Sequence, residues 1–184
     1  VDGSDTTSYV AFYNFGDVGQ NEDDRIVSGY KYEGVVVPQI QYLSNNRSIA
    51  LKDNGFTIYQ GSQIPKEVKT IETDKEIVST FYDDDMVGLV FKNDSKDKQY
   101  IMEVYNTADG KLKFKEDFNI PYTTIKLSGG NILMYNSSQM CVMNSRGVQK
   151  YLGSVDGTIK DFFKIGMNRY LLVLDSGVDV IKLS

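Results

Sequence analysis

Residues 100–120 read YIMEVYNTADGKLKFKEDFNI and contain a strand, a turn and a second strand in the order of a β-hairpin. Apolar and polar residues alternate along 100–106, as they do on a strand with one buried face. Asp109 and Gly110 follow as a turn signal, because both residue types accept turn geometry, and apolar residues resume at Leu112. The stretch predicts antiparallel strands and raises the question of whether this hairpin stands alone or belongs to a repeat.

The pattern of the first strand in this hairpin recurs along the chain. At five places a short apolar alternation ends in a polar residue, and the middle residues of these places are Tyr13, Tyr59, Tyr105, Met143 and Ile181. Successive middle residues are separated by roughly 40 residues, which is the period of a WD40-like propeller blade. The hairpin therefore belongs to one unit of a repeat.

Three further strand patterns accompany each unit. Leading strands are expected at 37–43, 77–82, 124–127 and 162–165. Second strands, each followed by polar turn residues, contain Ile49, Leu89, Ile132 and Leu171. More polar closing strands are expected at 68–73, 112–118 and 148–155. No stretch has helical periodicity over ten residues.

The sequence thus predicts an all-β, β-propeller-like fold with about four blades of four antiparallel strands. Residues 1–184 are expected to form a single domain of three full blades plus two partial ones. The chain opens at a third strand, 9–14, and ends at another third strand, 178–183, so the partial blades cannot merge into one. We expect an arc or part of a larger propeller, whose uncovered edges associate with missing N-terminal blades or with a second copy of the chain.

Composition excludes several classes of function. The 184 residues have a formal net charge of -5, no histidine and one cysteine, Cys141. Nucleic acid is an unexpected partner, because phosphate binding needs a basic stripe. Without histidine the chain lacks the commonest general base and metal ligand. Cys141 lies in an apolar strand and is expected to be an inert core thiol. The longest apolar run, 170–174, is far shorter than a membrane helix, so no membrane contact is expected for this segment itself.

Four longer phrases resemble a family of Gram-positive bacterial proteins. They are YNFGDVGQNEDDRIVSGYKYEG at 13–34, SIALKDNGFTIYQG at 48–61, GGNILMYNSSQMCVMN at 129–144 and NRYLLVLDSGVDVIKL at 168–183. Members of that family have one N-terminal transmembrane helix and an extracytoplasmic β-propeller-like region. The resemblance implies that this chain is the C-terminal part of such a region, located at the cell surface and anchored by a transmembrane helix that the chain lacks. It implies no activity and no functional residues.

Five residues are candidates for a ligand or partner surface: Tyr13, Tyr59, Tyr105, Asp156 and Asp161. The tyrosines occupy equivalent blade positions, where they either pack blade on blade with the hydroxyl reaching water or contribute to a ligand surface. The two aspartates flank the entry to the last blade, where they are either solvated or facing a central channel. No catalytic residue, metal ligand or cofactor-binding residue is predicted.

Acidic runs at 23–24 and 83–85 could offer carboxylate oxygens to calcium, but adjacent residues of an extended chain point to opposite faces, so solvated turns are favoured. Residues 53–55 lack the spacing and the final Glu of a calcium loop, so a plain hairpin turn is favoured there. No nucleophile elbow, phosphate loop or dinucleotide fingerprint is present. The phrase at 104–111 is similar to the repeat of quinoprotein-type propellers, but those enzymes dock their blades with a repeated Trp, and this chain has none. No cofactor is therefore expected.

The sequence favours a non-catalytic, extracytoplasmic interaction domain that binds a protein or a cell-wall component, and it does not favour an enzyme. Two alternatives stay open. An aromatic and acidic cluster would favour a glycan- or peptide-binding sensor propeller. Two carboxylates within mutual reach, at least one with a shifted pKa, would favour a carboxylate-based hydrolase or lyase.

Overall fold

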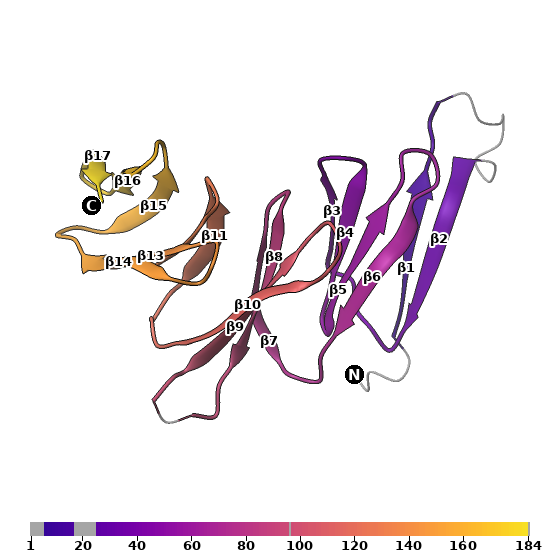
Figure 1. The fold of residues 1–184 in the computed structure, drawn as a ribbon, viewed down its shortest axis with the longest axis horizontal. Helices are drawn as coiled ribbons and strands as arrows, with labels where there is room; N and C mark the ends of the chain where they lie inside the picture. The colour runs from indigo at the N-terminus through magenta and orange to yellow at the C-terminus, as the bar shows by residue number, and fades with distance from the viewer. Residues whose placement is uncertain (1–5, 17–24, 96, 184) are drawn as a thin grey trace. The chain divides into compact units, whose positions relative to one another are not determined.

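The chain folds into antiparallel β-sheets joined in sequence order (Figure 1). A computed structural model describes residues 6–16, 25–95 and 97–183, and within these ranges there are 17 strands and no α-helix. The all-β fold expected from the sequence is confirmed. No apolar helix long enough to cross a membrane is found in the described part of the chain.

The strands form five sheets of two, four, four, four and three strands. The first sheet pairs β1 (Thr7–Tyr13) with β2 (Ile26–Glu33). The second contains β3 (Gln39–Leu43), β4 (Arg47–Lys52), β5 (Gly55–Gln60) and β6 (Lys66–Glu72). The third contains β7 (Ile77–Tyr82), β8 (Met86–Lys92), β9 (Tyr100–Asn106) and β10 (Leu112–Phe118). The fourth contains β11 (Thr124–Ser128), β12 (Asn131–Tyr135), β13 (Gln139–Asn144) and β14 (Gln149–Ser154), and the fifth contains β15 (Ile159–Lys164), β16 (Arg169–Leu174) and β17 (Gly177–Lys182).

Each complete sheet is a four-stranded meander. The hairpin at 100–120 supplies β9 and β10, the third and fourth strands of the third sheet. The middle residues of the sequence repeat all lie on corresponding strands, namely β1, β5, β9, β13 and β17. Hairpin connections explain this topology, since short turns rich in Asn, Asp and Gly can join only antiparallel neighbours.

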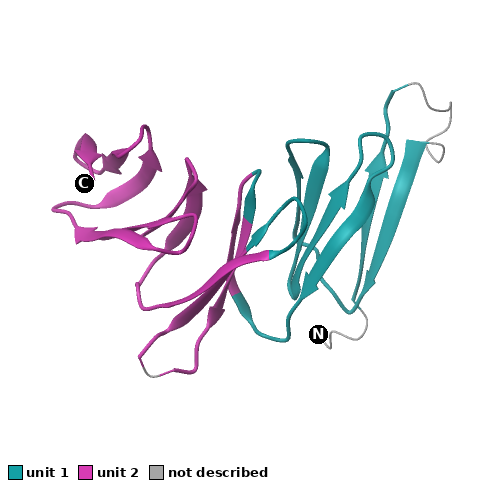
Figure 2. Cartoon of the chain, viewed as in Figure 1, with its two compact units in different colours: residues 1–77, 84–86, 105–111 teal, residues 78–83, 87–104, 112–184 magenta. Residues whose placement is uncertain are grey.

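The contacts of the chain divide it into two compact units (Figure 2). Unit 1 comprises residues 1–77, 84–86 and 105–111, and unit 2 comprises residues 78–83, 87–104 and 112–184. Each unit has a core between successive sheets. In unit 1 the buried residues Val10 and Phe12 of β1 pack with Ala50 and Tyr59 of the second sheet. In unit 2 the core lies between the fourth and fifth sheets.

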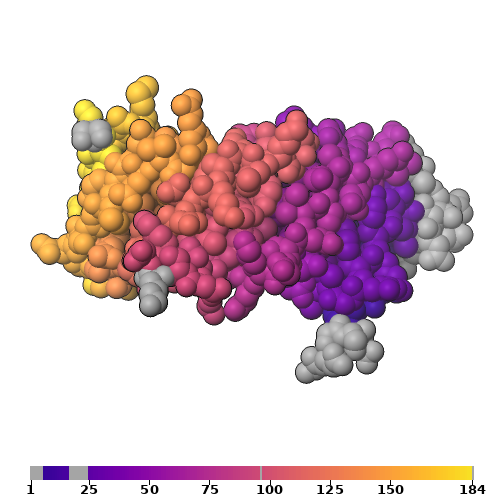
Figure 3. Space-filling view, turned by 60° about the horizontal axis from the view of Figure 1, so that its bottom comes forward, coloured from indigo at the N-terminus to yellow at the C-terminus, as the bar shows by residue number. Residues whose placement is uncertain are grey.

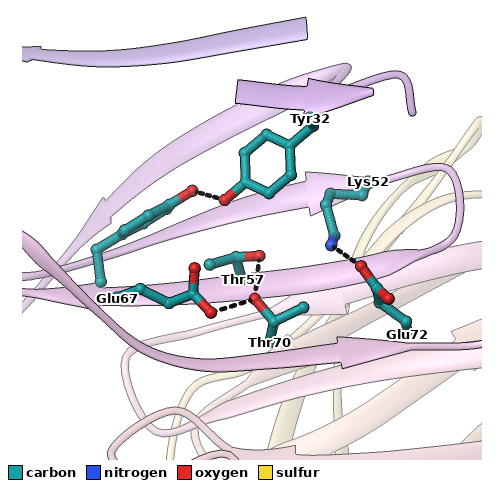
Figure 4. A network of polar contacts seen from close by, with 7 residues as sticks. Tyr32, Lys52, Thr57, Glu67, Thr70 and Glu72 are labelled. Atoms are coloured by element: carbon teal, nitrogen blue, oxygen red, sulfur yellow. Dashed lines mark hydrogen bonds and ion pairs between the residues drawn. The ribbon is translucent and has the colours of Figure 1, made fainter. Parts of the chain in front are cut away.

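A lysine interrupts the apolar pattern of β4 in unit 1. The Lys52 side chain has no exposed surface, and its Nζ donates to Glu72 Oε1 at 3.0 Å (Figure 4). The same Nζ lies 5.0 Å from the centroid of the Tyr32 ring. A buried ammonium group is costly unless it is paired. Glu72 on β6 therefore makes it possible for Lys52 to lie inside the sheet stack.

Hydroxyl groups satisfy one another beside this ion pair. The Thr57 hydroxyl donates to Thr70 Oγ1 at 2.7 Å, because the Thr70 hydroxyl donates in turn to Glu67 at 2.9 Å (Figure 4). The Tyr59 hydroxyl shares a hydrogen bond with Tyr32. Burial, together with that hydrogen bond, raises the pKa of Tyr59 above its usual value of 10.0. These contacts pair the hydroxyl groups of Thr57, Thr70, Tyr32 and Tyr59, whereas the buried Ser28 Oγ and Asn54 Oδ1 have no hydrogen-bond partner among the described residues.

Gly88 on β8 lies under the ring of Phe81, where a Cβ atom would come within 2.0 Å of Phe81 Cζ. We predict that Gly88→Ala lowers the free energy of unfolding by about 1–3 kcal/mol, because the buried ring has to move out of its packed position. Thermal unfolding followed by circular dichroism measures the loss. Gly29→Ala on β2 is the matched control, since no heavy atom lies within 4 Å of its added Cβ. Equal losses for both variants would contradict the packing explanation.

Candidate interaction surface

The fifth sheet, at the orange-to-yellow end of the chain in Figure 3, packs one face on the fourth sheet through Phe162, Tyr170 and Leu172. Residues that alternate with the core positions of β16 and β17 form the uncovered face: Leu171, Val173, Val178 and Val180. We call these four residues the C-terminal face. They pair across the strands, Leu171 with Val180 and Val173 with Val178. Val178 is 60% exposed and Val180 is 51% exposed, so an apolar patch is open to solvent.

The corresponding face of the fourth sheet is buried. Its equivalent cross-strand pairs are Leu133 with Val142 and Tyr135 with Met140. All four side chains belong to the core that the fifth sheet covers, and none is more than 6% exposed. The repeat therefore places apolar pairs at these positions for contact with a following sheet.

The second sheet follows the same rule. Its equivalent pairs are Ile49 with Ile58 and Leu51 with Phe56. None of these side chains is more than 3% exposed. The C-terminal face thus has the apolar composition of a buried blade face, although part of it is exposed to solvent. An apolar patch of this kind indicates a site of protein contact.

The strand β17 is also an open edge. It pairs with β16, and in the part of the chain that the structure describes no strand pairs with its other side. At the equivalent edges β6 pairs with β5 and β14 pairs with β13, and most residues of β5 and β13 are buried. Most residues of β17 are exposed. A free edge of this kind can accept an additional antiparallel strand.

The three candidate tyrosines occupy equivalent strand positions but differ in burial. Tyr13 ends β1 and is 48% exposed. Tyr59 has no exposed surface and packs edge-to-face on Phe12 with 5.1 Å between ring centroids. Tyr105 is 8% exposed and packs on Phe56 with 5.3 Å between ring centroids. Tyr59 and Tyr105 therefore contribute to packing, and Tyr13 alone of the three presents its ring to solvent.

The two candidate aspartates have different surroundings. Asp156 is exposed in the turn between β14 and β15. Asp161 on β15 forms an ion pair with Lys126 of β11 and accepts a hydrogen bond from the Tyr135 hydroxyl at 2.7 Å. The Lys126 ammonium also lies 4.4 Å from the centroid of the Phe163 ring. Asp161 thus joins the first strands of the fourth and fifth sheets.

The electrostatics of Asp161 follow from these contacts. Partial burial by itself raises the pKa of Asp161, but hydrogen bonds from Lys126, Tyr135 and the Phe162 amide outweigh it and hold the pKa below the usual 3.8. Burial and the hydrogen bond to Asp161 raise the pKa of Tyr135 to about 12. A carboxyl group that acts as a general acid near neutral pH needs a raised pKa, whereas the pKa of Asp161 is lowered. Lys126 could have been noted from the sequence as the cation of the leading strand 124–127.

The acidic runs have turn-stabilising contacts. Asp84 Oδ1 accepts the Ser44 amide hydrogen at 2.7 Å. Within the described ranges no three His, Cys, Asp or Glu side chains gather as metal ligands. Asp23 and Asp24 lie outside the described residues. Cys141 on β13 is fully buried, and burial raises its thiol pKa to about 12, so it is a core residue.

We predict that Asp161→Asn destabilises the protein at neutral pH and that the difference from wild type shrinks as the pH falls below about 4. The folded pKa of Asp161 lies below the unfolded one, so its stabilising effect is present above the unfolded pKa and is lost as the pH falls through the folded pKa. Melting temperatures measured between pH 7 and pH 3 test this. Asp156→Asn removes an exposed carboxylate and controls for net charge. A difference that stays constant with pH would contradict the ion-pair explanation.

A family model described as a family of unknown function, DUF5711, matches residues 1–183, so the chain belongs to that family. A search of curated proteins finds no match. Similar solved structures include BamB from Moraxella catarrhalis, with 12% identity, a TM-score of 0.50, and 90% of this chain and 46% of that chain covered. The WD40 domain of SCAP from fission yeast has 12% identity and a TM-score of 0.56, with 80% and 42% covered. The WD40 β-propeller domain of Doa1 has 10% identity and a TM-score of 0.50, with 80% and 51% covered.

These similarities establish the fold but no specific role. The four-stranded antiparallel sheets of this chain match parts of known β-propellers. The chain spans about half the length of the structures it matches.

Proposed function

We propose that this DUF5711 member is a non-catalytic interaction domain that binds a protein partner in the extracytoplasmic space. The C-terminal face carries the proposal, because two of its apolar residues are exposed and two are half-buried at positions that are buried in the second and fourth sheets. The extracytoplasmic location is supported by the resemblance of the four sequence phrases to membrane-anchored cell-surface proteins.

The energetics indicate what kind of partner fits. Complete burial of a valine contributes about 1.5–3 kcal/mol, and Val178 and Val180 already bury part of their surface, so covering both adds only a few kcal/mol. Association itself costs at least that much. Backbone hydrogen bonds from a further strand at the free edge of β17, in the plane of the sheet, would add to the contact over its face. A β-sheet with an apolar face and a neighbouring strand fits this surface, and such a partner can come from a longer polypeptide or from a second copy.

We predict that the double substitution of Val178→Lys with Val180→Lys abolishes self-association of the chain. Light scattering over a range of concentrations should give a mass that rises with concentration for the wild type and stays at the monomer value for the variant, because two ammonium groups cannot be buried without partners. Val68→Lys combined with Val148→Lys is the matched control, since these valines are 42% and 51% exposed and lie elsewhere.

The control pair should associate as the wild type does. A wild-type chain that stays monomeric at all concentrations would exclude the second copy as the partner. Capture of envelope proteins by the wild type and by the lysine variant then tests whether the partner is a different polypeptide, either a longer one that supplies a further blade or another protein. Equal capture by both chains would overturn the assignment of the C-terminal face as the interface.

A further inference from the structure

A pocket of about 380 Å³ opens in unit 1, where the loops that follow β1, β3 and β5 meet. Its lining includes three exposed aromatic side chains and three exposed amide side chains: Tyr13, Phe15, Tyr42, Asn45, Asn46 and Gln63. A volume of this size lies within the range of small-ligand sites. The C-terminal face belongs to unit 2, so the pocket and that face share no residue.

The aromatic side chains form apolar surfaces of defined orientation. The rings of Tyr13 and Phe15 stack with 6.1 Å between centroids and 18° between planes. The Arg25 guanidinium lies 5.9 Å from the Phe15 centroid and helps to hold that ring. Tyr42 is 69% exposed and contacts the buried Phe12 edge-to-face. Tyr13 and Tyr42 therefore offer ring surface to a ligand.

Two of the three amides, Asn45 and Asn46, lie in the turn between β3 and β4, and Gln63 lies in the loop between β5 and β6. Asn45 and Asn46 have φ angles of 59° and 55°, in the left-handed region, and lie in the three-residue connection 44–46 between the paired residues Leu43 and Arg47. Asparagine tolerates this conformation, and glycine would serve the turn equally well. The side-chain amides of Asn45, Asn46 and Gln63 have no hydrogen-bond partner among the residues that the structure describes, so each can donate to and accept from a ligand.

Contacts behind the turn hold it in place. The Ser44 amide donates to Asp84 Oδ1 at 2.7 Å, and the Arg47 guanidinium donates to Thr107 Oγ1 at 2.9 Å. The Thr107 hydroxyl donates to the Asp84 carbonyl oxygen at 2.5 Å, so both ends of the turn are tied to the pair Asp84 and Thr107. All these residues belong to unit 1. A site ordered before binding loses less entropy when a ligand enters.

The pocket offers little accessible charge. Its lining includes one charged residue, Arg47, which is 6% exposed and donates to Thr107 and to the Ser44 carbonyl oxygen. An acidic ligand needs an accessible cation for a charge-assisted hydrogen bond. The pocket therefore suits a neutral ligand that has both apolar patches and many hydroxyl groups.

We infer that this pocket binds a neutral carbohydrate of one or two sugar rings. The C–H face of a pyranose ring is apolar and packs on an aromatic ring such as Tyr42, while a side-chain amide matches a pair of adjacent hydroxyl groups by donating to one and accepting from the other. This activity goes beyond the proposed protein contact and does not depend on it.

Isothermal titration calorimetry of the full chain with cellobiose and with N,N′-diacetylchitobiose tests the inference. We expect at least one of them to bind with a Kd of about 1 mM or lower. Tyr42→Ala, and separately the double substitution Asn45→Gly with Asn46→Gly, should each weaken binding about tenfold, because a stacking surface or two amides are lost. The glycine variant keeps the turn geometry and should keep the wild-type melting temperature.

Tyr9→Ala is the matched control, since Tyr9 lies on the same strand as Tyr13, is 72% exposed and does not line the pocket. It should bind as the wild type does. Absence of binding to both disaccharides, equal weakening by Tyr9→Ala, or tighter binding of glucuronic acid or of a proline-rich peptide would overturn the inference. The Val178→Lys and Val180→Lys variant should still bind sugar, so failure of the protein interface and failure of the sugar site are distinguishable.

Discussion

The packing of apolar sheet faces on one another is the interaction on which this structure depends. A single four-stranded sheet of this sequence cannot cover both of its faces, and the pairs of Ile49 with Ile58 and of Leu133 with Val142 are buried only because other parts of the chain cover them. Burial of each such side chain contributes about 1.5–3 kcal/mol, so the repeat is stable as a stack and not as separate blades. Lys52, the buried lysine of the second sheet, is paired with Glu72.

The same interaction explains where the two proposed functions lie. The C-terminal face has the residues of a buried face without a described sheet over it, and for this reason we propose it as the surface for a partner. The pocket lies instead where the ends of β1, β3 and β4 meet the loops that follow β1, β3 and β5, at the border of the packed sheets. Loops such as 44–46 are held by the sheets that they connect, and binding sites often lie on loops that a rigid scaffold positions.

Much of the fold follows from the repeat, and the departures have local causes. The leading strand expected at 37–43 begins at Gln39, because Pro38 has no amide hydrogen to donate to a ladder. The strand expected from Phe162 begins at Ile159, since an irregularity between Ile159 and Asp161 shifts the register and conceals the alternation. The repeat also predicts the strand that contains Tyr42, but of the pocket residues it singles out only Tyr13 as a candidate, because a strand or turn pattern does not show which side chains meet in a pocket.

The sequence by itself determined the all-β class, the blade period and the order of the strands, because alternation and turn residues are local signals. The tertiary structure decided which equivalent residues are surface. Tyr13 and Tyr59 occupy the same place in the repeat, yet one is half-exposed and the other is fully buried. Val180 and Val142 differ in the same way. Burial depends on whether another sheet lies over a residue, and that is a property of the assembled stack, which no local pattern encodes.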